Sequence, residues 1–275
     1  MAGPARLGSP VVPTALGHPP RSALLAAWGN AWLQADATLP ELVARVVQAD
    51  EGHAVIGLAP DDVPLEQAVT RLRAAGVTAL RVVLPAPGDV VGLPGPGGFS
   101  TAALAAAEAT LCLRPDGTAV GLVPSVTSHG SAFDGTVTTV RWTSFDVAAP
   151  LADPGPFLHD AEHDLRIGVV QCAKVLGELD VARWRPELAA ALDALRQQTR
   201  RGVTEDELPG GYPIRARELL ARARQLAVVL HLAGEDQGGA VDSREATARE
   251  SALRDLARVV RHAHVAAYNA YRLPG

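Results

Sequence analysis

A loop rich in glycine and proline, LPAPGDVVGLPGPGG, lies between an apolar segment typical of a strand and an alanine-rich segment typical of a helix. Nucleotide-binding proteins hold phosphate groups through backbone amides at this kind of junction. The loop side chains with recognition chemistry are Asp89, Phe99 and Ser100, and Gly95 and Gly98 complete the candidate binding set. The loop is therefore the first place where the sequence suggests a ligand.

The details of this loop argue against phosphate binding. Its glycines do not follow the G-x-G-x-x-G pattern, and no lysine follows them as in a P-loop. Pro85, Pro87, Pro94 and Pro96 remove backbone N–H groups, which are the donors that a phosphate cradle needs. We therefore predict a rigid segment that covers one end of the sheet or docks a partner.

Two histidines, His159 and His163, lie four residues apart and would share one face of a helix. Such a pair can bind a metal, but zinc usually needs a third and a fourth ligand. The pair lies away from the apolar stripe of its helix, and acidic residues beside it suit a helix N-terminus. We therefore expect a solvated helix start, and His159 and His163 remain only candidate metal ligands.

Arginines near the C-terminus form a row at helical spacing, Arg254, Arg258 and Arg261. Such a row could bind nucleic acid or an acidic partner. Acidic residues such as Glu250 and Asp255 are interleaved with it and favour ordinary surface ion pairs. The net charge of −5 also gives no general attraction to nucleic acid or to an anionic membrane.

Other catalytic patterns are weak. No G-x-S-x-G motif occurs, and Cys112 and Cys172 are far apart with no CxxC partner, as expected of small buried side chains in a reducing compartment. The sequence predicts no catalytic residue and no cofactor. With no signal peptide or membrane span in the pattern, we expect a cytoplasmic protein.

The elements that must position these residues fall into two halves. After a disordered segment over residues 1–21, residues 22–148 predict an α+β domain that starts with two helices, with Ser22 and Thr38 as N-caps. Segments 53–58 and 78–84 with the helix between them predict a βαβ unit. The RPDG turn predicts a hairpin of strands 110–113 and 118–123, and a polar loop then leads to a long strand over 136–147. We expect a mixed sheet of about five strands.

The second half, residues 149–275, begins with a linker and shows only helical patterns. Four amphipathic segments with short connections predict an up-and-down four-helix bundle, over residues 157–179, 182–198, 212–234 and 242–273.

Four stretches of the chain carry a family resemblance: ALLAAWGNAWL, LPAPGDVVGLPGPGGFSTAAL, DVARWRPELAAAL and GGAVDSREATARESALRDLARVV. They resemble segments of an uncharacterised protein family of high-GC Gram-positive (actinobacterial) bacteria. The resemblance implies no activity and no residue roles.

The leading hypothesis is a non-enzymatic interaction or scaffold protein, because amphipathic helices are plentiful and paired catalytic residues are lacking. It would bind a protein partner or itself through the helical bundle and the Gly/Pro loop. One alternative is an enzyme or small-ligand-binding protein that uses the sheet mouth near Asp89 and Ser100. Another is a nucleic-acid accessory factor that uses the arginine row.

Overall fold

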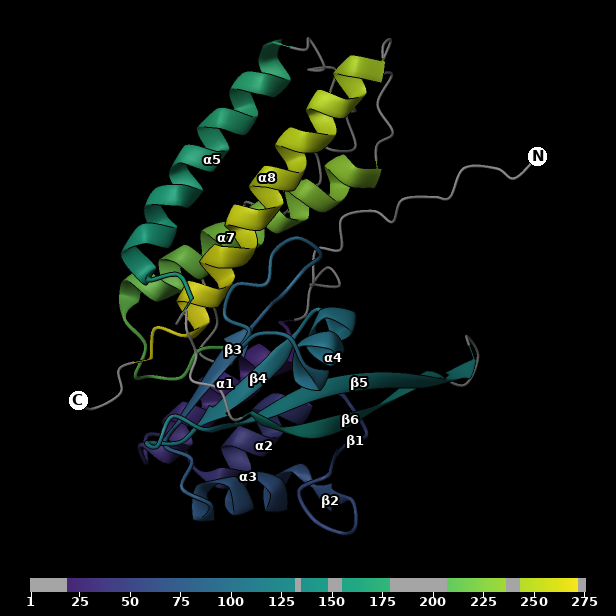
Figure 1. Ribbon diagram of the computed structural model, residues 1–275, viewed down its shortest axis with the longest axis vertical. Helices are drawn as coiled ribbons and strands as arrows, with labels where there is room; N and C mark the ends of the chain where they lie inside the picture. Colours follow the sequence, from purple (N-terminus) through teal and green to yellow (C-terminus); the bar gives the residue numbers. More distant parts are fainter. Residues whose placement is uncertain (1–18, 132–134, 148–154, 179–206, 236–242, 272–275) are drawn as a thin grey trace.

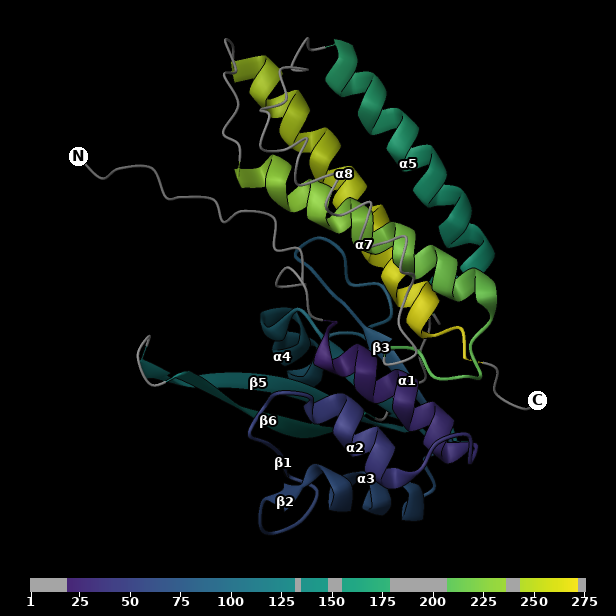
Figure 2. The same ribbon diagram turned by 180° about the vertical axis from the view of Figure 1, so that it is seen from behind.

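The computed structural model describes residues 19–131, 135–147, 155–178, 207–235 and 243–271. The protein has an α+β fold, in which a mixed sheet with helices is followed by packed C-terminal helices (Figures 1 and 2). The predicted disordered segment lies almost entirely outside the described residues. No helix in these ranges is long and apolar enough to cross a membrane.

Two helices open the described chain, α1 (Arg21–Leu33) and α2 (Leu39–Val47). Helix α2 begins as predicted, because Thr38 and Glu41 form a reciprocal capping box. Ser22 is not the N-cap of α1, since the helix already starts at Arg21. The Ser22 amide instead donates to the Glu108 carboxylate at 2.8 Å, so a residue distant in sequence supplies the cap. Residues 22–31 of α1 are all buried, which makes this helix the centre of the core.

The sheet has six strands in the order β2-β1-β6-β5-β4-β3. The strands are β1 (Gly52–Ile56), β2 (Val63–Pro64), β3 (Ala79–Val83), β4 (Ala109–Leu113), β5 (Ala119–Ser131) and β6 (Gly135–Val147). Among these described strands, β1 and β6 pair in parallel and the other neighbours pair antiparallel. Helices α1, α2 and α3 (Leu65–Ala74) and the helix α4 (Gly98–Ala106) complete this half.

The prediction of a βαβ unit is wrong. Strands β1 and β3 lie far apart in the sheet and run in opposite directions, because β6, β5 and β4 lie between them. A βαβ crossover needs its helix to pack across both strands. Helix α3 instead contacts β1, β2 and α2, and β3 pairs with β4 at the far edge.

The hairpin around the RPDG turn is confirmed as β4 and β5, with Gly117 at a φ of +85° and Asp116 accepting from the Thr118 amide at 2.9 Å. The prediction of a polar loop after this hairpin is also wrong. Strand β5 continues to Ser131 and stays paired with β6 along its length. These strands form an arm that projects away from the rest of the sheet (Figures 1 and 2). Alternating Val and Thr side chains favour such a ribbon over a loop.

The helical half contains α5 (Leu158–Glu178), α7 (Ile214–Glu235) and α8 (Ser243–Tyr268). Helix α8 packs against both α5 and α7 (Figure 1). The segment 182–198, predicted as another helix of a four-helix bundle, lies outside the described residues. The C-terminal end of α8 also reaches β3 and α1, so one helix joins the two halves.

The outer edge of β3 is closed by two asparagine side chains. Asn30 of α1 accepts from the Leu80 amide and donates to the Leu80 carbonyl, both at 2.8 Å. Asn269, just after α8, does the same for Val82 at 2.9 and 3.0 Å. These are the only two asparagines in the sequence. Each side-chain amide therefore replaces the backbone of a missing neighbouring strand.

Replacing these asparagines tests that role. We expect Asn30→Ala to lower the free energy of unfolding by about 2–4 kcal/mol, because two buried backbone groups of Leu80 lose their partners. Asn269→Ala should cost less, about 1–2 kcal/mol, since Asn269 is half-buried and water can replace it. Urea unfolding followed by circular dichroism measures both.

Gln67→Ala on the exposed side of α3 removes a similar amide and is the control. Its effect should stay within about 0.5 kcal/mol. An Asn30→Ala protein as stable as the wild type would contradict the edge-closing role.

Candidate functional site

The Gly/Pro loop begins with a tight turn that presents Asp89. Ala86 and Asp89 exchange two backbone hydrogen bonds of 2.8 and 2.9 Å. Between them, Pro87 precedes Gly88, which has a φ of +80°. Proline followed by a glycine with positive φ is the pattern of a type II turn. The loop runs from β3 toward the helical half, and the turn brings Asp89 to α8 (Figure 1).

Asp89 is held by two consecutive residues of α8. The Arg261 guanidinium donates to Asp89 Oδ2, and His262 Nε2 lies 3.0 and 2.9 Å from the two carboxylate oxygens. Asp89 and Arg261 are both buried. Burial alone would raise the pKa of Asp89, but the hydrogen bonds from His262 and Arg261 outweigh burial and lower this pKa to about 2. Asp89 is thus a permanently charged anchor at neutral pH, unsuited to act as a base.

The other loop candidates have structural partners. Phe99 packs in a small core between the sheet and α4, where its ring lies 6.1 Å from that of Phe145. Gly121 faces this ring so closely that an added Cβ would lie 2.3 Å from it. The Ser100 hydroxyl donates to the Gly95 carbonyl within the loop, and the N-cap of α4 is Gly97. Gly95 has a φ of +118°, which requires glycine.

Gly98 begins α4 and lies over Phe145, at ordinary contact distance for an added Cβ. Among the predicted loop residues, only Asp89 therefore reaches beyond its own half of the protein.

The arginine row does not form one surface. Arg261 is buried against Asp89, whereas Arg254 and Arg258 are exposed. Arg254 donates to Glu250 at 2.7 Å, and Arg258 lies 3.8 Å from Asp255. The expected surface ion pairs are confirmed for these two arginines. The buried ion pair of Asp89 with Arg261 therefore joins the Gly/Pro loop to the arginine row, which the sequence suggested as separate candidate sites.

His159 and His163 lie on the exposed side of α5, as the pattern predicts. Arg166 lies 3.0 Å from His163 Nδ1, and Glu162 pairs with Arg215 of α7. In the part of the chain that the structure describes, no group of three or more His, Cys, Asp or Glu could hold a metal ion.

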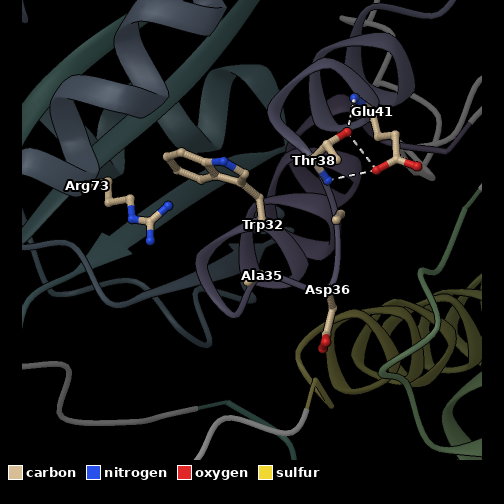
Figure 3. A pocket seen from close by; sticks show the side chains of 7 residues that line it. Trp32, Ala35, Asp36, Thr38, Glu41 and Arg73 are labelled. Carbon is tan, nitrogen blue, oxygen red and sulfur yellow. Dashed lines mark hydrogen bonds between the residues drawn. The ribbon is translucent and has the colours of Figure 1, made fainter.

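An open pocket of about 350 Å³ lies where α1 passes into α2 (Figure 3). Its lining residues are Trp32, Ala35, Asp36, Ala37, Thr38, Glu41 and Arg73. The Arg73 guanidinium lies 5.0 Å from the centre of the Trp32 ring, which is a cation–π contact. Its other polar groups serve the capping box of α2 and, at Asp36, a hydrogen bond from Tyr271. The pocket therefore lacks a group prepared for catalysis.

No local sequence pattern predicts a chain of partly buried polar side chains that lies in the sheet half. Arg21 forms two hydrogen bonds of 2.7 and 2.8 Å with Asp50, and Asp50 lies 2.9 Å from His53 Nε2. Trp142 donates to His53 Nδ1 at 3.2 Å, so the His53 proton lies on Nε2 and is donated to Asp50. Burial lowers the pKa of His53. Both ring nitrogens are occupied, which leaves His53 no site for a metal or a substrate.

A second missed cluster contains all three tyrosines of the chain. The Tyr212 hydroxyl donates to the Tyr268 carbonyl, and the Tyr268 hydroxyl donates to the buried Glu207. Tyr271 packs edge-on against Tyr212, with ring centres 5.3 Å apart, and donates to Asp36. Burial raises the pKa of Glu207 and of Tyr268. The cluster fixes the end of α8 to the segment before α7 and to the turn after α1.

Comparison with known proteins places the chain in a family. Residues 22–156 match the family described as Rv1486c-like protein, N-terminal domain, and residues 159–265 match the family described as Rv1486c-like protein, C-terminal domain. The chain belongs to the Rv1486c-like family. The predicted resemblance to an uncharacterised actinobacterial family is thereby confirmed.

Relatives of this Rv1486c-like chain occur in mycobacteria. The uncharacterised protein Rv1486c of Mycobacterium tuberculosis is 31% identical over 290 residues, which cover 90% of this chain and 96% of the relative. The uncharacterised protein MAV321 of Mycobacterium avium is 30% identical over 304 residues, with the same two coverages. A third, ML1804 of Mycobacterium leprae, is 31% identical over 203 residues, or 70% of this chain and 67% of the relative. No solved structure matches the chain.

The lowered pKa of Asp89 predicts how the stability of this Rv1486c-like protein depends on pH. Because the folded pKa lies below the ordinary value of 3.8, the contribution of Asp89 is complete above about pH 4 and is lost as the pH falls toward 2. The loss should be about 2 kcal/mol. Asp89→Asn should lower stability at pH 7 and should flatten the curve between pH 4 and 2.

Urea unfolding at a series of pH values measures this effect. Asp61→Asn, at an exposed aspartate, is the matched control and should keep the wild-type pH profile. If Asp89→Asn and Asp61→Asn show the same profile, Asp89 is not the anchor described here.

Proposed function

We propose that this protein is a non-enzymatic interaction protein that binds a protein partner or itself through its helical half and the adjacent Gly/Pro loop. The observation that carries the proposal is a set of large apolar side chains exposed on that half. Val170 of α5 is 64% exposed, Ile214 at the start of α7 is 74% exposed, and Phe157 just before α5 is 66% exposed. Exposed apolar groups that gather on one part of a protein favour protein contacts.

The position of these side chains supports a common surface. On α5, Ile167 and Val170 are three residues apart and both exposed, so they share a face. Arg215 donates to Glu162, which holds the N-terminal ends of α5 and α7 together. Phe157 and Ile214 belong to these two ends.

The loop adds one apolar side chain beside the same half. Val90 follows the anchor Asp89 and is 56% exposed. Because Asp89 is tied to α8, Val90 is held close to the helices by a short, stiff connection. The loop thus offers Val90 as a further apolar side chain for the proposed contact.

The two alternatives have less support. An enzyme at the sheet mouth would need Asp89 or Ser100, but Asp89 is bound by Arg261 and Ser100 by Gly95. A nucleic-acid factor would need the arginine row, in which Arg261 is buried and the exposed Arg254 has an acidic partner.

Charge substitutions on the helical surface test the proposal. A tagged protein is used for affinity capture from host cells, and captured proteins are quantified by mass spectrometry. We expect Val170→Glu and Ile214→Glu to reduce the captured partner at least about tenfold, since a charge must be desolvated at an apolar contact. Val90→Glu examines the loop separately.

The matched control is Gln171→Glu, which adds the same charge beside Val170 at an exposed polar position. It should capture the partner as the wild type does. Equal capture by wild type, Val170→Glu and Ile214→Glu would overturn the proposal, as would a strictly monomeric protein that captures nothing.

A further inference from the structure

The edges of the sheet are treated in different ways. The β3 edge is closed by Asn30 and Asn269. The opposite edge is β2, which has only two residues and ends in Pro64. Short strands, prolines and covered edges all prevent unwanted strand pairing. In the arm formed by β5 and β6, the outer edge of β5 is neither closed by side chains nor shortened.

Strand β5 is paired on only one side along most of the arm. Strand β4 pairs with β5 only from Ala119 to Leu122, whereas β6 pairs with β5 as far as Ser131. Residues 125–130 are exposed, and the arm projects into solvent (Figures 1 and 2). The described residues 125–131 and 135–140 contain no Asp, Glu, Lys or Arg. Within these ranges the arm lacks the charges that usually block an edge.

The strand register shows which backbone groups face outward. The backbone N–H and C=O groups of Leu80 and Val82 point away from β4, toward the asparagines. The backbone groups of the other β3 residues therefore bond to β4. Because bonding alternates along each antiparallel strand, the even-numbered residues of β5 face β4 or the open edge. The Glu51 amide bonds to the Thr138 carbonyl, which agrees with this alternation on β6. Val126, Ser128 and Gly130 thus offer free N–H and C=O groups.

We infer that this edge of β5 pairs with the same edge of a second copy of the chain, in antiparallel orientation about Ser128. This register places Val126 of each copy opposite Gly130 of the other and Ser128 opposite itself. It uses the three outward-facing residues that have an N–H and leaves the outward-facing Pro124, which has none, outside the pairing. The branched valine fills the space that the glycine leaves.

A second copy suits this edge better than a charged partner. Because residues 125–131 and 135–140 contain no Asp, Glu, Lys or Arg, these parts of two arms approach each other without direct charge repulsion, although each chain carries a net charge of −5. An edge with a two-fold axis through it is self-complementary, as closed dimers require. The outward strand also reaches the roughly five to six residues of an average strand. The contact is small compared with standard interfaces of about 1,600 Å², so the dimer should be weak and depend on concentration.

This inference concerns a different surface from the one proposed on α5 and α7, and it does not depend on that proposal. Sedimentation velocity of the full chain, from about 1 to 500 µM, should show a reversible dimer for the wild type. Ser128→Pro removes the central outward N–H but leaves the bonds to β6, so it should be monomeric at all these concentrations. Ser128→Ala keeps the N–H and is the matched control, which should dimerise as the wild type does.

A cysteine variant gives an independent measurement. Ser128→Cys should form an intermolecular disulfide under mild oxidation, because the two Ser128 positions face each other in the dimer. Val137→Cys, on the β6 side of the same arm, should crosslink at least about tenfold more slowly. The native cysteines are buried and do not interfere.

A wild type that stays monomeric at the highest concentration would overturn the inference. A Ser128→Pro protein that still dimerises, or equal crosslinking of the two cysteine variants, would also overturn it. Partner capture by Ser128→Pro is measured in parallel. If Ser128→Pro is monomeric but still captures the partner, the arm and the helical surface act separately. The dimer inference and the proposed function can therefore each fail without the other.

Discussion

An open strand edge must find partners for its backbone groups, and the structure is organised around how β3 meets this requirement. Asn30 and Asn269 supply those partners from α1 and from the end of α8. An asparagine side chain places an N–H donor beside a carbonyl acceptor, as a peptide group does, so it can replace the backbone of a neighbouring strand. Because the two asparagines come from opposite ends of the chain, closing this edge also fixes the sheet half against the helical half.

The ion pair of Asp89 with Arg261 and the tyrosine cluster reinforce the same junction. The asparagine contact, the ion pair and the tyrosine cluster all involve the C-terminal end of α8 or the residues just after it, and α8 also packs with α5 and α7. Polar side chains that could have served catalysis are therefore used to hold the protein together. The surfaces proposed above for recognition are an apolar part of the helical half and the open edge of β5 in the arm.

Local patterns predicted the elements well where short-range physics decides. The N-cap residue Thr38 predicted the start of α2, and the RPDG turn predicted the β4–β5 hairpin. They failed where a distant residue decides. The start of α1 is capped by Glu108, and the arrangement of β1 and β3 depends on β6 pairing beside β1. The continuation of β5 to Ser131 depends on cross-strand pairs with β6, which no pattern within β5 alone contains.

By itself, the sequence determined the α+β character and the helical second half, because periodicity, proline and glycine act within a few residues. It also determined the solvated position of His159 and His163 through the apolar stripe of their helix. Only the tertiary structure decided that Asp89 meets Arg261, that both asparagines close one edge, and that the arm stays open. These contacts join residues up to 187 positions apart. Their geometry depends on how whole elements pack, and local spacing carries no information about that packing.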